Sequence, residues 1–501
     1  MRRAKIVCTL GPATSTPEKI RQLVDAGMNV ARLNLSHGSY ADHESVYRMV
    51  REASDASGHA VGVLVDLQGP KIRLGRFADG TARVAPGDEF TITTRDILGS
   101  QLICSTTYDG LPGDVRPGDK ILIDDGRITL IATAVTETDV VTRVRIGGAL
   151  SNNKGINLPG VAVSVLAMSE KDVEDLRWAL RLRADLIALS FVRSADDAAD
   201  VRRIMDDEQV WLPVIAKIEK PQAIDRIDEI IAAFDGVMVA RGDLGVELPL
   251  EEVPVLQKQV IEAARRNAKP VVVATQMLES MISAARPTRA EASDVANAVL
   301  DGADAVMLSG ETSVGAYPIL SVETMARIIE STEDHGLTRM AAMSWQPRTR
   351  GGVIAKAAAE VAERVGAKYL VAFSQSGDTA RRLSRYRSPV PVLCFTPEPV
   401  VRSQLALTWG IETFLGPRVE HTDEMVMQVD KALLDAGRCE EGEQVVIVAG
   451  SPPGIPGSTN ALRVHQMGDA INGAAPAYRS VARNEDLLTH AIAADADPDQ
   501  G

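Results

Sequence analysis

Cysteine, aromatic residues and long apolar runs are all scarce in this sequence, and each shortage argues against a class of protein. The four cysteines are far apart among 501 residues and form no C-x-x-C pair, so neither a disulfide scaffold nor a zinc knuckle is expected. Aromatic residues make up only 4%, too few for the stacking platforms of proteins that bind single-stranded nucleic acid. No apolar stretch approaches the roughly 18 residues of a membrane span. The short apolar run near the N-terminus predicts a strand and not a signal peptide.

Positive charge is also in deficit. Lys and Arg number 54 against 68 Asp and Glu, which gives a net charge of −14. An excess of negative charge opposes salt-sensitive binding to nucleic acid and to anionic membrane surfaces. Because no disulfide framework is expected either, the composition predicts a cytoplasmic protein that binds neither nucleic acid nor a membrane.

The length and an ordinary apolar fraction of 45% suggest about three folded domains. Short β-branched runs alternate with longer amphipathic runs through most of the first 335 residues. This alternation favours an α/β fold with a parallel (β/α)8 barrel, also called a TIM barrel, over an open doubly wound sheet. The eight expected strands are residues 4–10, 29–35, 61–66, 186–191, 214–218, 237–240, 271–275 and 305–308.

Two further regions depart from the barrel pattern. Residues 71–165 are rich in Thr, Val, Ile and turn residues, which predicts an inserted all-β domain. The barrel would therefore be discontinuous and comprise residues 1–70 and 166–335. After a polar connection, alternation resumes over residues 352–478 and predicts an open-sheet α/β domain. The Ala- and Asp-rich residues 479–501 predict a disordered tail.

The expected carboxyl ends of six barrel strands carry polar side chains. Active sites of such barrels gather at this end, so these side chains should meet in one mouth. The set comprises Arg32, Asn34 and Ser36 after the second strand, Asp66 after the third, Lys217 and Glu219 after the fifth, Asp243 after the sixth, Thr275 after the seventh and Ser309 after the eighth.

Two carboxylates of this set are candidate metal ligands. Glu219 and Asp243 end strands expected to be neighbours, about 4.8 Å apart, so they could share one divalent cation with waters and substrate oxygens. Lys217 stands in the same apolar strand as Glu219, where a lysine is costly unless it meets an anion. A phosphoryl group held by Lys217, Arg32 and the cation would supply that anion. The alternatives are two solvated acids and a lysine paired structurally with Asp66 or Asp243.

Five segments around these residues resemble signatures of the pyruvate kinase family, in the same order along the chain. They are residues 29–38 (NVARLNLSHG), 215–219 (IAKIE), 239–245 (VARGDLG), 274–281 (ATQMLESM) and 307–312 (MLSGET). The resemblance covers nearly the whole chain except the tail. It implies a barrel, a β-domain lid inserted after the third strand and a C-terminal regulatory α/β domain. It also implies a homotetramer and the reaction of phosphoenolpyruvate with ADP to give pyruvate and ATP.

The resemblance further implies a role for each site residue. Lys217, helped by Arg32, would stabilise the transferring phosphoryl group, and Glu219 and Asp243 would hold Mg²⁺ or Mn²⁺. The backbone of Arg241, Gly242 and Asp243 would cradle the substrate carboxylate, Thr275 and Ser309 would belong to a hydroxyl–water relay that protonates the enolate carbon, and Asn34, His37, Arg73 and Lys154 would contact the nucleotide. Closure of the lid would exclude water, so that the phosphoryl group goes to ADP.

Residues 373–379, which join a strand to a helix start, resemble the effector pocket of the family. That pocket recognises phosphorylated sugars, and N–H groups and hydroxyls at a helix N-terminus suit a phosphate. We therefore expect a phosphorylated allosteric activator, with residues 450–458 closing the pocket. The residues on its phosphate would be Ser374, Ser376, Gly377 and Thr379. An ordinary capped turn is the alternative.

One departure from the family pattern concerns a monovalent cation. The resemblance implies a K⁺ site formed by Asn34, Ser36, Asp66 and the carbonyl of Leu67. Lys71 stands where most of the family carries glutamate, so the local charge changes from negative to positive. Two like charges about 4 Å apart repel by on the order of 4 kcal/mol at an effective dielectric near 20. We therefore expect the ammonium of Lys71 to replace K⁺, as in the family branch that works without it; in the alternative, Lys71 points to solvent and K⁺ binds.

Two other functions stay open at this point. A Mg²⁺-dependent lyase or mutase that acts on pyruvate or its enolate could use the same barrel, although it would not need a lid with nucleotide-binding cations. A binding-only sensor could keep the fold without turnover. The presence of Lys217, Glu219, Asp243 and Thr275 favours the kinase.

Overall fold

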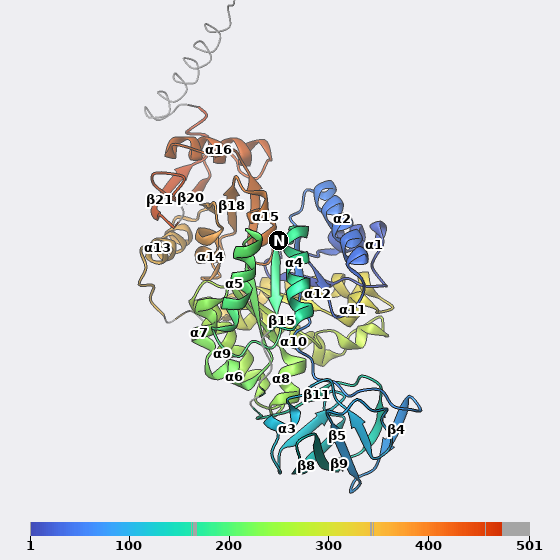
Figure 1. Cartoon of the computed structure of the whole chain (residues 1–501). Coiled ribbons are helices and arrows are strands. Elements are labelled where there is room, and N and C mark those ends of the chain that lie inside the picture. Colours follow the sequence, from blue (N-terminus) through green and yellow to red (C-terminus); the bar gives the residue numbers. More distant parts are fainter. Residues whose placement is uncertain are drawn as a thin grey trace, which may run out of the picture. The chain divides into compact units, whose positions relative to one another are not determined.

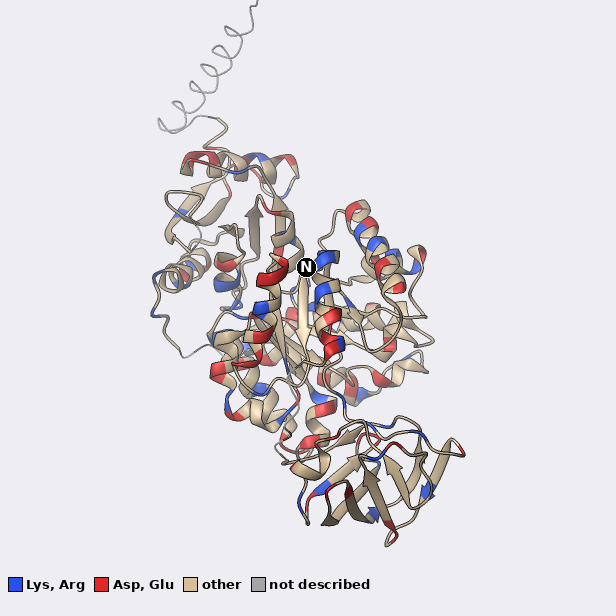
Figure 2. Cartoon of the chain, in the orientation of Figure 1, with Lys and Arg blue, Asp and Glu red and all other residues tan. Residues whose placement is uncertain are grey.

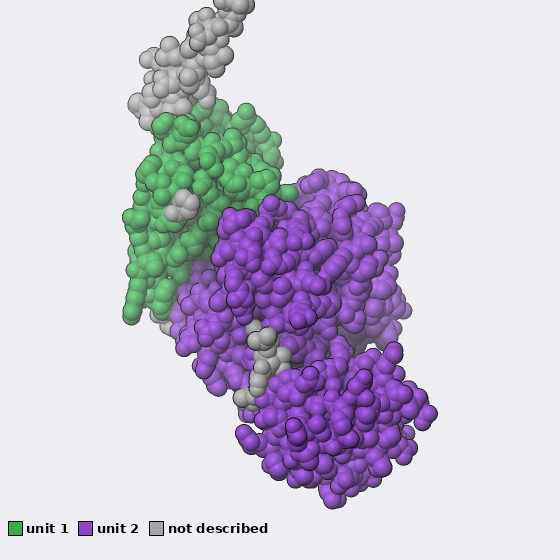
Figure 3. Space-filling view, viewed as in Figure 1, with its two compact units in different colours: residues 1–5, 330–501 green, residues 6–329 purple. Residues whose placement is uncertain are grey.

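The computed structural model describes residues 2–161, 163, 168–340, 343, 345–455 and 457–472. The chain divides into two compact units (Figure 3): residues 6–329, and residues 330–501 together with 1–5. The expected lid therefore lies in the same compact unit as the barrel. The expected lid boundary at residue 165 and the tail 479–501 fall outside the described residues.

Eight parallel strands close into the expected barrel (Figure 1). They are β1 (Lys5–Thr9), β2 (Val30–Asn34), β3 (Gly62–Asp66), β12 (Leu186–Leu189), β13 (Val214–Ile218), β14 (Gly236–Ala240), β15 (Val271–Ala274) and β16 (Ala305–Leu308). Around the barrel their order is β1, β16, β15, β14, β13, β12, β3, β2. The strands are almost wholly buried, as parallel strands covered on both faces must be. The prediction of a barrel is confirmed, and the doubly wound sheet is excluded.

Amphipathic helices connect the strands around the outside of the barrel. They are α1 (Pro17–Ala26), α2 (Tyr40–Ser57), α4 (Glu170–Leu182), α5 (Asp197–Glu208), α6 (Pro221–Asp225), α7 (Ile227–Ala233), α8 (Arg241–Glu247), α9 (Val253–Arg266), α10 (Arg289–Asp301), α11 (Gly310–Ser313) and α12 (Pro318–Gly336), with a 3-10 turn at Glu279–Ile282. Thr16, Ser39, Ser169 and Thr288 begin four of them by accepting a hydrogen bond from the amide three residues on. Residues of both charge signs occur along α4 and α5 (Figure 2).

In the inserted segment after β3, the described residues are all-β apart from one short helix. A six-stranded sheet has the order β11 (Ile156–Asn157), β7 (Lys120–Ile123), β8 (Ile128–Val135), β9 (Asp139–Ile146), β5 (Glu89–Thr93), β6 (Ile103–Ser105), and β10 (Gly148–Ser151) pairs with β4 (Thr81–Val84). The helix is α3 (Leu111–Asp114). The segment has its own apolar core, which includes Phe90, Ile121 and Leu130.

The second unit contains a five-stranded sheet in the order β19 (Ile411–Leu415), β18 (Val392–Thr396), β17 (Tyr369–Phe373), β20 (Gln444–Gly450), β21 (Thr459–Gln466), with only β21 antiparallel. Its main helices are α13 (Arg350–Val365), α14 (Asp378–Ser384), α15 (Pro399–Leu405) and α16 (Thr422–Asp435), and a 3-10 turn covers Leu337–Arg339. Leu370 and Ala372 of β17 enter one core, and Val371 between them enters the other. The sheet is thus buried on both faces, as expected for an α/β domain. Among the described residues, no helix is long and apolar enough to cross a membrane.

Every second junction between barrel strands carries the same side-chain clamp at the end opposite the mouth. In each, the residue just before a strand accepts a hydrogen bond from an amide of the strand that precedes it in the chain. The pairs are Asn29 with Ile6 at 3.0 Å, Asp185 with Val63 at 2.7 Å, Asp235 with Val214 at 2.9 Å and Asp304 with Val271 at 3.1 Å. These clamps fix the strand register, and hence which side chains reach the mouth.

We expect Asp185→Ala to destabilise the barrel more than Asp235→Ala. Both carboxylates accept a strand amide and pair with an arginine, but the Asp185 side chain is 4% exposed and that of Asp235 is 38% exposed. Breaking a buried pair costs about 3 kcal/mol, whereas an exposed pair contributes about 1 kcal/mol or less. Thermal unfolding followed by circular dichroism measures both variants. Equal shifts in melting temperature would contradict this account of the clamps.

Candidate active site

The carboxyl ends of the barrel strands surround a cavity of about 470 Å³. All but one of the side chains expected at the mouth line it: Arg32, Asn34, Ser36, Asp66, Lys217, Asp243, Thr275 and Ser309. Glu219, which is 1% exposed, is absent from this lining. Ser36 lies beyond the end of β2, and the side-chain oxygen of Asn34 holds it there by accepting a hydrogen bond from its amide at 3.2 Å.

A lysine ammonium lies at the centre of this group. Lys217 Nζ is 2.9 Å from Glu219 Oε1 and 3.3 Å from Asp66 Oδ1, and it donates a hydrogen bond to Ser190 Oγ at 2.7 Å. Burial alone would lower the pKa of Lys217, but the Asp66 and Glu219 carboxylates outweigh burial and raise it. Lys217 is therefore a fixed positive charge at neutral pH.

Arg32 completes the charge balance around Asp66. Its Nε donates to Asp66 Oδ2 at 2.6 Å, and one of its terminal nitrogens donates to Thr9 Oγ1 at 2.8 Å. Burial would raise the pKa of Asp66, but Arg32 and Lys217 outweigh it and lower that pKa. Asp66 is thus a shared anion that holds the two cations at one wall of the cavity.

Glu219 and Asp243 are left with excess negative charge. Burial raises the pKa of Glu219, Lys217 opposes the rise, and the nearby Asp243 carboxylate adds to it. The strands β13 and β14 that precede these residues are paired neighbours, as expected. Two carboxylates that repel each other beside an open cavity fit a divalent cation, whose remaining ligands would be water and substrate oxygens. No cluster of three or more His, Cys, Asp or Glu suited to a metal occurs in the described ranges, so a closed protein cage is not built there.

Thr275 has a constrained place at the end of β15. It and Gln276 both have left-handed backbone angles, with φ of 69° and 54°. This turn aims the Thr275 hydroxyl at the first turn of α8, where it accepts a hydrogen bond from Gly242 N at 2.8 Å and donates to Ala274 O at 2.6 Å. The Gly242 amide that the family resemblance assigns to substrate therefore has a hydroxyl partner in this structure.

The side chain of Arg241 is not aimed at the cavity. It pairs with Asp294 at 2.7 Å and donates to the carbonyl of Thr275 at 2.7 Å, so it braces the loops after β14 and β15.

Ser309 has a buried hydroxyl with no hydrogen-bond partner within the described part of the chain. Its amide donates to Glu311 at 2.7 Å. Ser309 is therefore held by its backbone with a hydroxyl available to a ligand.

A larger cavity of about 1500 Å³ adjoins the first, because Lys71 and Asp243 line both. Arg73 and Lys154, two of the four expected nucleotide contacts, line it, and Lys154 pairs with Asp124 at 2.7 Å. The other two expected nucleotide residues are elsewhere. Asn34 lines the smaller cavity, and His37 is exposed and belongs to the lining of neither.

Three of the four expected K⁺ ligands already have donors. Both oxygens of Asp66 face cations, the side-chain oxygen of Asn34 accepts the Ser36 amide, and the carbonyl of Leu67 accepts the hydroxyl of Ser190 at 2.7 Å. Lys71 lines the same cavity, and the described residues include no ion-pair partner for it.

Ser190 was not identified from the sequence. It follows β12, is 1% exposed and contacts both Lys217 and the carbonyl of Leu67. A lone serine at a strand end carries no pattern of its own. The expected strand 186–191 included Ser190, and β12 ends at Leu189, so the sequence pattern did not mark Ser190 as a residue of the mouth.

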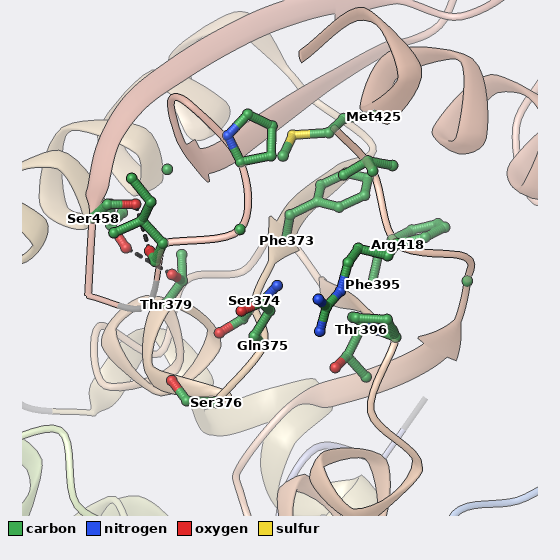
Figure 4. Close-up of a pocket in the computed structure, with 18 of the residues that line it drawn as sticks. Phe373, Ser374, Gln375, Ser376, Thr379, Phe395, Thr396, Arg418, Met425 and Ser458 are labelled. Atoms are coloured by element: carbon green, nitrogen blue, oxygen red, sulfur yellow. Dashed lines mark hydrogen bonds between the residues drawn. The ribbon is translucent and has the colours of Figure 1, made fainter. Parts of the chain in front are cut away.

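A third cavity, of about 650 Å³, lies in the second unit (Figure 4). The expected Ser374, Ser376 and Thr379 line it on the connection from β17 to α14, while Gly377 is not part of the lining and supplies a left-handed turn with φ of 77°. Thr379 Oγ1 is already within 2.7 Å of Thr459 Oγ1. Arg418, which no sequence pattern singled out, lines the cavity from the segment after β19 and adds a cation.

Removing either candidate metal ligand should weaken Mn²⁺ binding. Glu219→Gln and Asp243→Asn keep the side-chain shape and remove one negative charge each, so we expect the Mn²⁺ dissociation constant to rise about 10-fold or more. Electron paramagnetic resonance of free Mn²⁺ measures it directly. The matched control Glu44→Gln, on the exposed face of α2, should leave it unchanged. Unaltered Mn²⁺ binding in both site variants would rule out this metal site.

Comparison with known proteins agrees with the geometry. A family model described as the pyruvate kinase barrel domain matches residues 1–322, and one described as the pyruvate kinase alpha/beta domain matches residues 353–465. The chain is 60% identical to a pyruvate kinase of Mycobacterium intracellulare over 93% of this chain and 99% of that protein. For a pyruvate kinase of Corynebacterium efficiens the identity is 57%, over 93% and 98%. A crystal structure of a pyruvate kinase from Cryptosporidium parvum superposes with a TM-score of 0.88 at 34% identity, over 93% of this chain and 96% of that one. The chain belongs to the pyruvate kinase family.

Proposed function

We propose that the barrel mouth is where this chain carries out the pyruvate kinase reaction, the transfer of the phosphoryl group of phosphoenolpyruvate to ADP to give pyruvate and ATP. The observation that carries the assignment is the buried Lys217 ammonium, which lies between the metal-ligand candidate Glu219 and a cavity lined by Arg32 and Asp243. A lyase or mutase on the same barrel would not need the adjoining cavity with Arg73 and Lys154. Family membership favours the kinase in the same way.

Lys217 and Arg32 stabilise the transferring phosphoryl group. Both are fixed cations at one wall, and Asp66 holds them so that little reorganisation is needed when charge develops on the phosphoryl oxygens. Glu219 and Asp243 would hold Mg²⁺ or Mn²⁺. A divalent cation bound there supplies charge neutralisation to the substrate carboxylate and phosphate.

Ser309 and Thr275 serve proton transfer to the enolate carbon. The buried Ser309 hydroxyl, unpartnered within the described residues, can donate to a substrate or a water. The Thr275 hydroxyl lines the same cavity, but its proton is donated to Ala274 O, so it must release that carbonyl before it can donate to a water or to the substrate. Ser309 is therefore the relay member whose proton is available, and Thr275 joins the relay once its proton leaves Ala274 O.

Lys217→Met tests this assignment. It removes the ammonium and keeps the length of the side chain, so we expect kcat to fall about 10²–10³-fold, the range for loss of one preorganised electrostatic group. Pyruvate formation from phosphoenolpyruvate and Mg-ADP is followed in a coupled assay, and the melting temperature is checked in parallel. Lys258→Met on the exposed face of α9 is the matched control. Absence of ADP-dependent pyruvate formation by the unmodified protein would refute the function and favour a binding-only sensor.

We further propose that this enzyme needs no K⁺. Three of the four ligands of the family's K⁺ site, Asn34, Asp66 and the carbonyl of Leu67, are already engaged by protein donors, and Lys71 lines the same cavity. We expect full turnover with Mg²⁺ in buffer free of K⁺ and NH₄⁺, and a dependence on K⁺ in Lys71→Glu. Steady-state rates with and without K⁺ measure both. Strong stimulation of the unmodified enzyme by K⁺ would show that Lys71 points away and the site is filled as in most of the family.

The cavity of the second unit is proposed to bind a phosphorylated effector. Ser374 and Ser376 supply hydroxyls, and Arg418 supplies the cation that a phosphate requires. Thr379, bonded to Thr459, would shape the pocket and contact the phosphate only after a change of partner. The identity of the effector, the homotetramer and the cytoplasmic location stay predictions.

Charge reversal at Arg418 should abolish activation. A panel of sugar phosphates and AMP is tested for a shift in the phosphoenolpyruvate saturation curve, and Arg418→Glu should lose the shift while kcat at saturation stays the same. Arg463→Glu, an exposed arginine paired with Asp423 in the same unit, is the control. A saturation curve that no member of the panel moves would count against an effector pocket here.

A further inference from the structure

The shortest contact of the catalytic ammonium is to a neutral hydroxyl. Lys217 Nζ lies 2.7 Å from Ser190 Oγ, against 2.9 Å from Glu219 Oε1 and 3.3 Å from Asp66 Oδ1. An ammonium has three N–H donors, so these three acceptors use all of them. Lys217 can donate to a phosphoryl oxygen only if it releases one acceptor.

The hydroxyl of Ser190 has a fixed orientation. Its own proton is donated to the carbonyl of Leu67 at 2.7 Å, so a lone pair of Oγ faces Lys217. The Leu67 amide in turn donates to Ala188 O at 3.0 Å, which ties Leu67 to the same strand that Ser190 follows. The hydrogen bond to Leu67 therefore fixes the Ser190 hydroxyl as an acceptor for Lys217.

The next residue fixes the other end of the ion pair. Phe191 has a left-handed φ of 55°, unusual for a residue with a side chain, and its amide donates to Glu219 Oε2 at 2.7 Å. Gly69 permits this arrangement, because a Cβ there would come within 2.6 Å of the Phe191 ring and 2.8 Å of Ser190 Cβ. Ser190 thus positions the Lys217 ammonium, and the Phe191 amide positions the Glu219 carboxylate beside it.

The three acceptors of Lys217 differ in how readily each can release its contact with the ammonium. Glu219 stays anchored to the Phe191 amide through Oε2, so its Oε1 can leave Lys217 for a metal ion without losing the carboxylate's place. Asp66 is the most distant acceptor and is shared with Arg32. Ser190 is uncharged and buried, and it is the acceptor nearest to Lys217 Nζ, so it is the contact that Lys217 can keep.

We propose that Ser190 is a positioning residue for phosphoryl transfer: its hydroxyl holds Lys217 in place while Lys217 exchanges Glu219 for the phosphoryl group. The proposal rests on the function proposed above. It adds a residue that acts through Lys217, and it includes the carbonyl of Leu67, which orients the Ser190 hydroxyl. Ser190 also lines the substrate cavity, so we expect loss of its hydroxyl to affect the cavity more than the barrel core.

The test compares Ser190→Ala with Ser190→Thr. Without the hydroxyl, Lys217 stays on Glu219, so we expect kcat to fall about 10–100-fold, the usual effect of losing a group that orients a site ligand. The KM for phosphoenolpyruvate should change much less. Ser190→Thr keeps the hydroxyl and should recover most of the loss. Ser321→Ala removes another buried serine hydroxyl, one that donates to a carbonyl at the start of α12, and should leave kcat unchanged.

A second readout does not depend on turnover. In Ser190→Ala the ammonium competes more strongly for Glu219 Oε1, so the Mn²⁺ dissociation constant should rise in the absence of substrate, and Ser190→Thr should restore it. A kcat within twofold of the unmodified enzyme, or a lower kcat with unaltered Mn²⁺ binding, would overturn the proposal. If the unmodified protein made no pyruvate, the proposed function would fail, and the Mn²⁺ comparison would still report on the contact between Ser190 and Lys217.

Discussion

The structure depends on a buried cluster in which two cations and two carboxylates hold one another inside the barrel mouth. Lys217 contacts Asp66 and Glu219, and Arg32 shares Asp66. Each of these ions would cost several kcal/mol to bury alone, and removing one partner of such a cluster leaves an uncompensated charge that costs about 3–5 kcal/mol. The cluster forms only where the ends of β2, β3 and β13 face a common interior, which closure of eight strands provides. The main energetic cost of the site is therefore the desolvation of these charges.

The charge imbalance within that cluster suits the proposed chemistry. Asp66 is satisfied by two cations, whereas Glu219 faces Lys217 and the additional negative charge of Asp243. The wall with Lys217 and Arg32 is therefore rich in positive charge. The neighbouring wall, with Glu219 and Asp243, attracts cations. A substrate with a carboxylate and a phosphate fits this division, with its phosphate toward Lys217 and Arg32. Because Asp243 and Lys71 also line the larger cavity, a second substrate there would lie beside the first.

The barrel and most of the mouth could be predicted from the sequence because parallel strands have strong local signals. Each buried apolar run ends at a polar residue, so the amino-acid pattern alone places Lys217, Glu219 and Asp243 at strand ends. Contacts that depend on the backbone path after a strand could not be predicted. The left-handed turns at Phe191 and Thr275, the role of Ser190, and the cation Arg418 at a distant cavity have no periodic signal. His37 belongs to a family motif, yet it lies outside both cavities.

During phosphoryl transfer, Lys217 is expected to stay anchored to Ser190 while it leaves Glu219 for the phosphoryl group. A crystal structure grown with Mn²⁺ and phosphoenolpyruvate, with anomalous scattering collected at the Mn edge, tests this most directly. We expect an anomalous peak between the carboxylates of Glu219 and Asp243, with Lys217 Nζ within hydrogen-bond distance of both Ser190 Oγ and a phosphate oxygen. A metal peak elsewhere, or a Lys217 that keeps Glu219 and leaves Ser190, would contradict this mechanism.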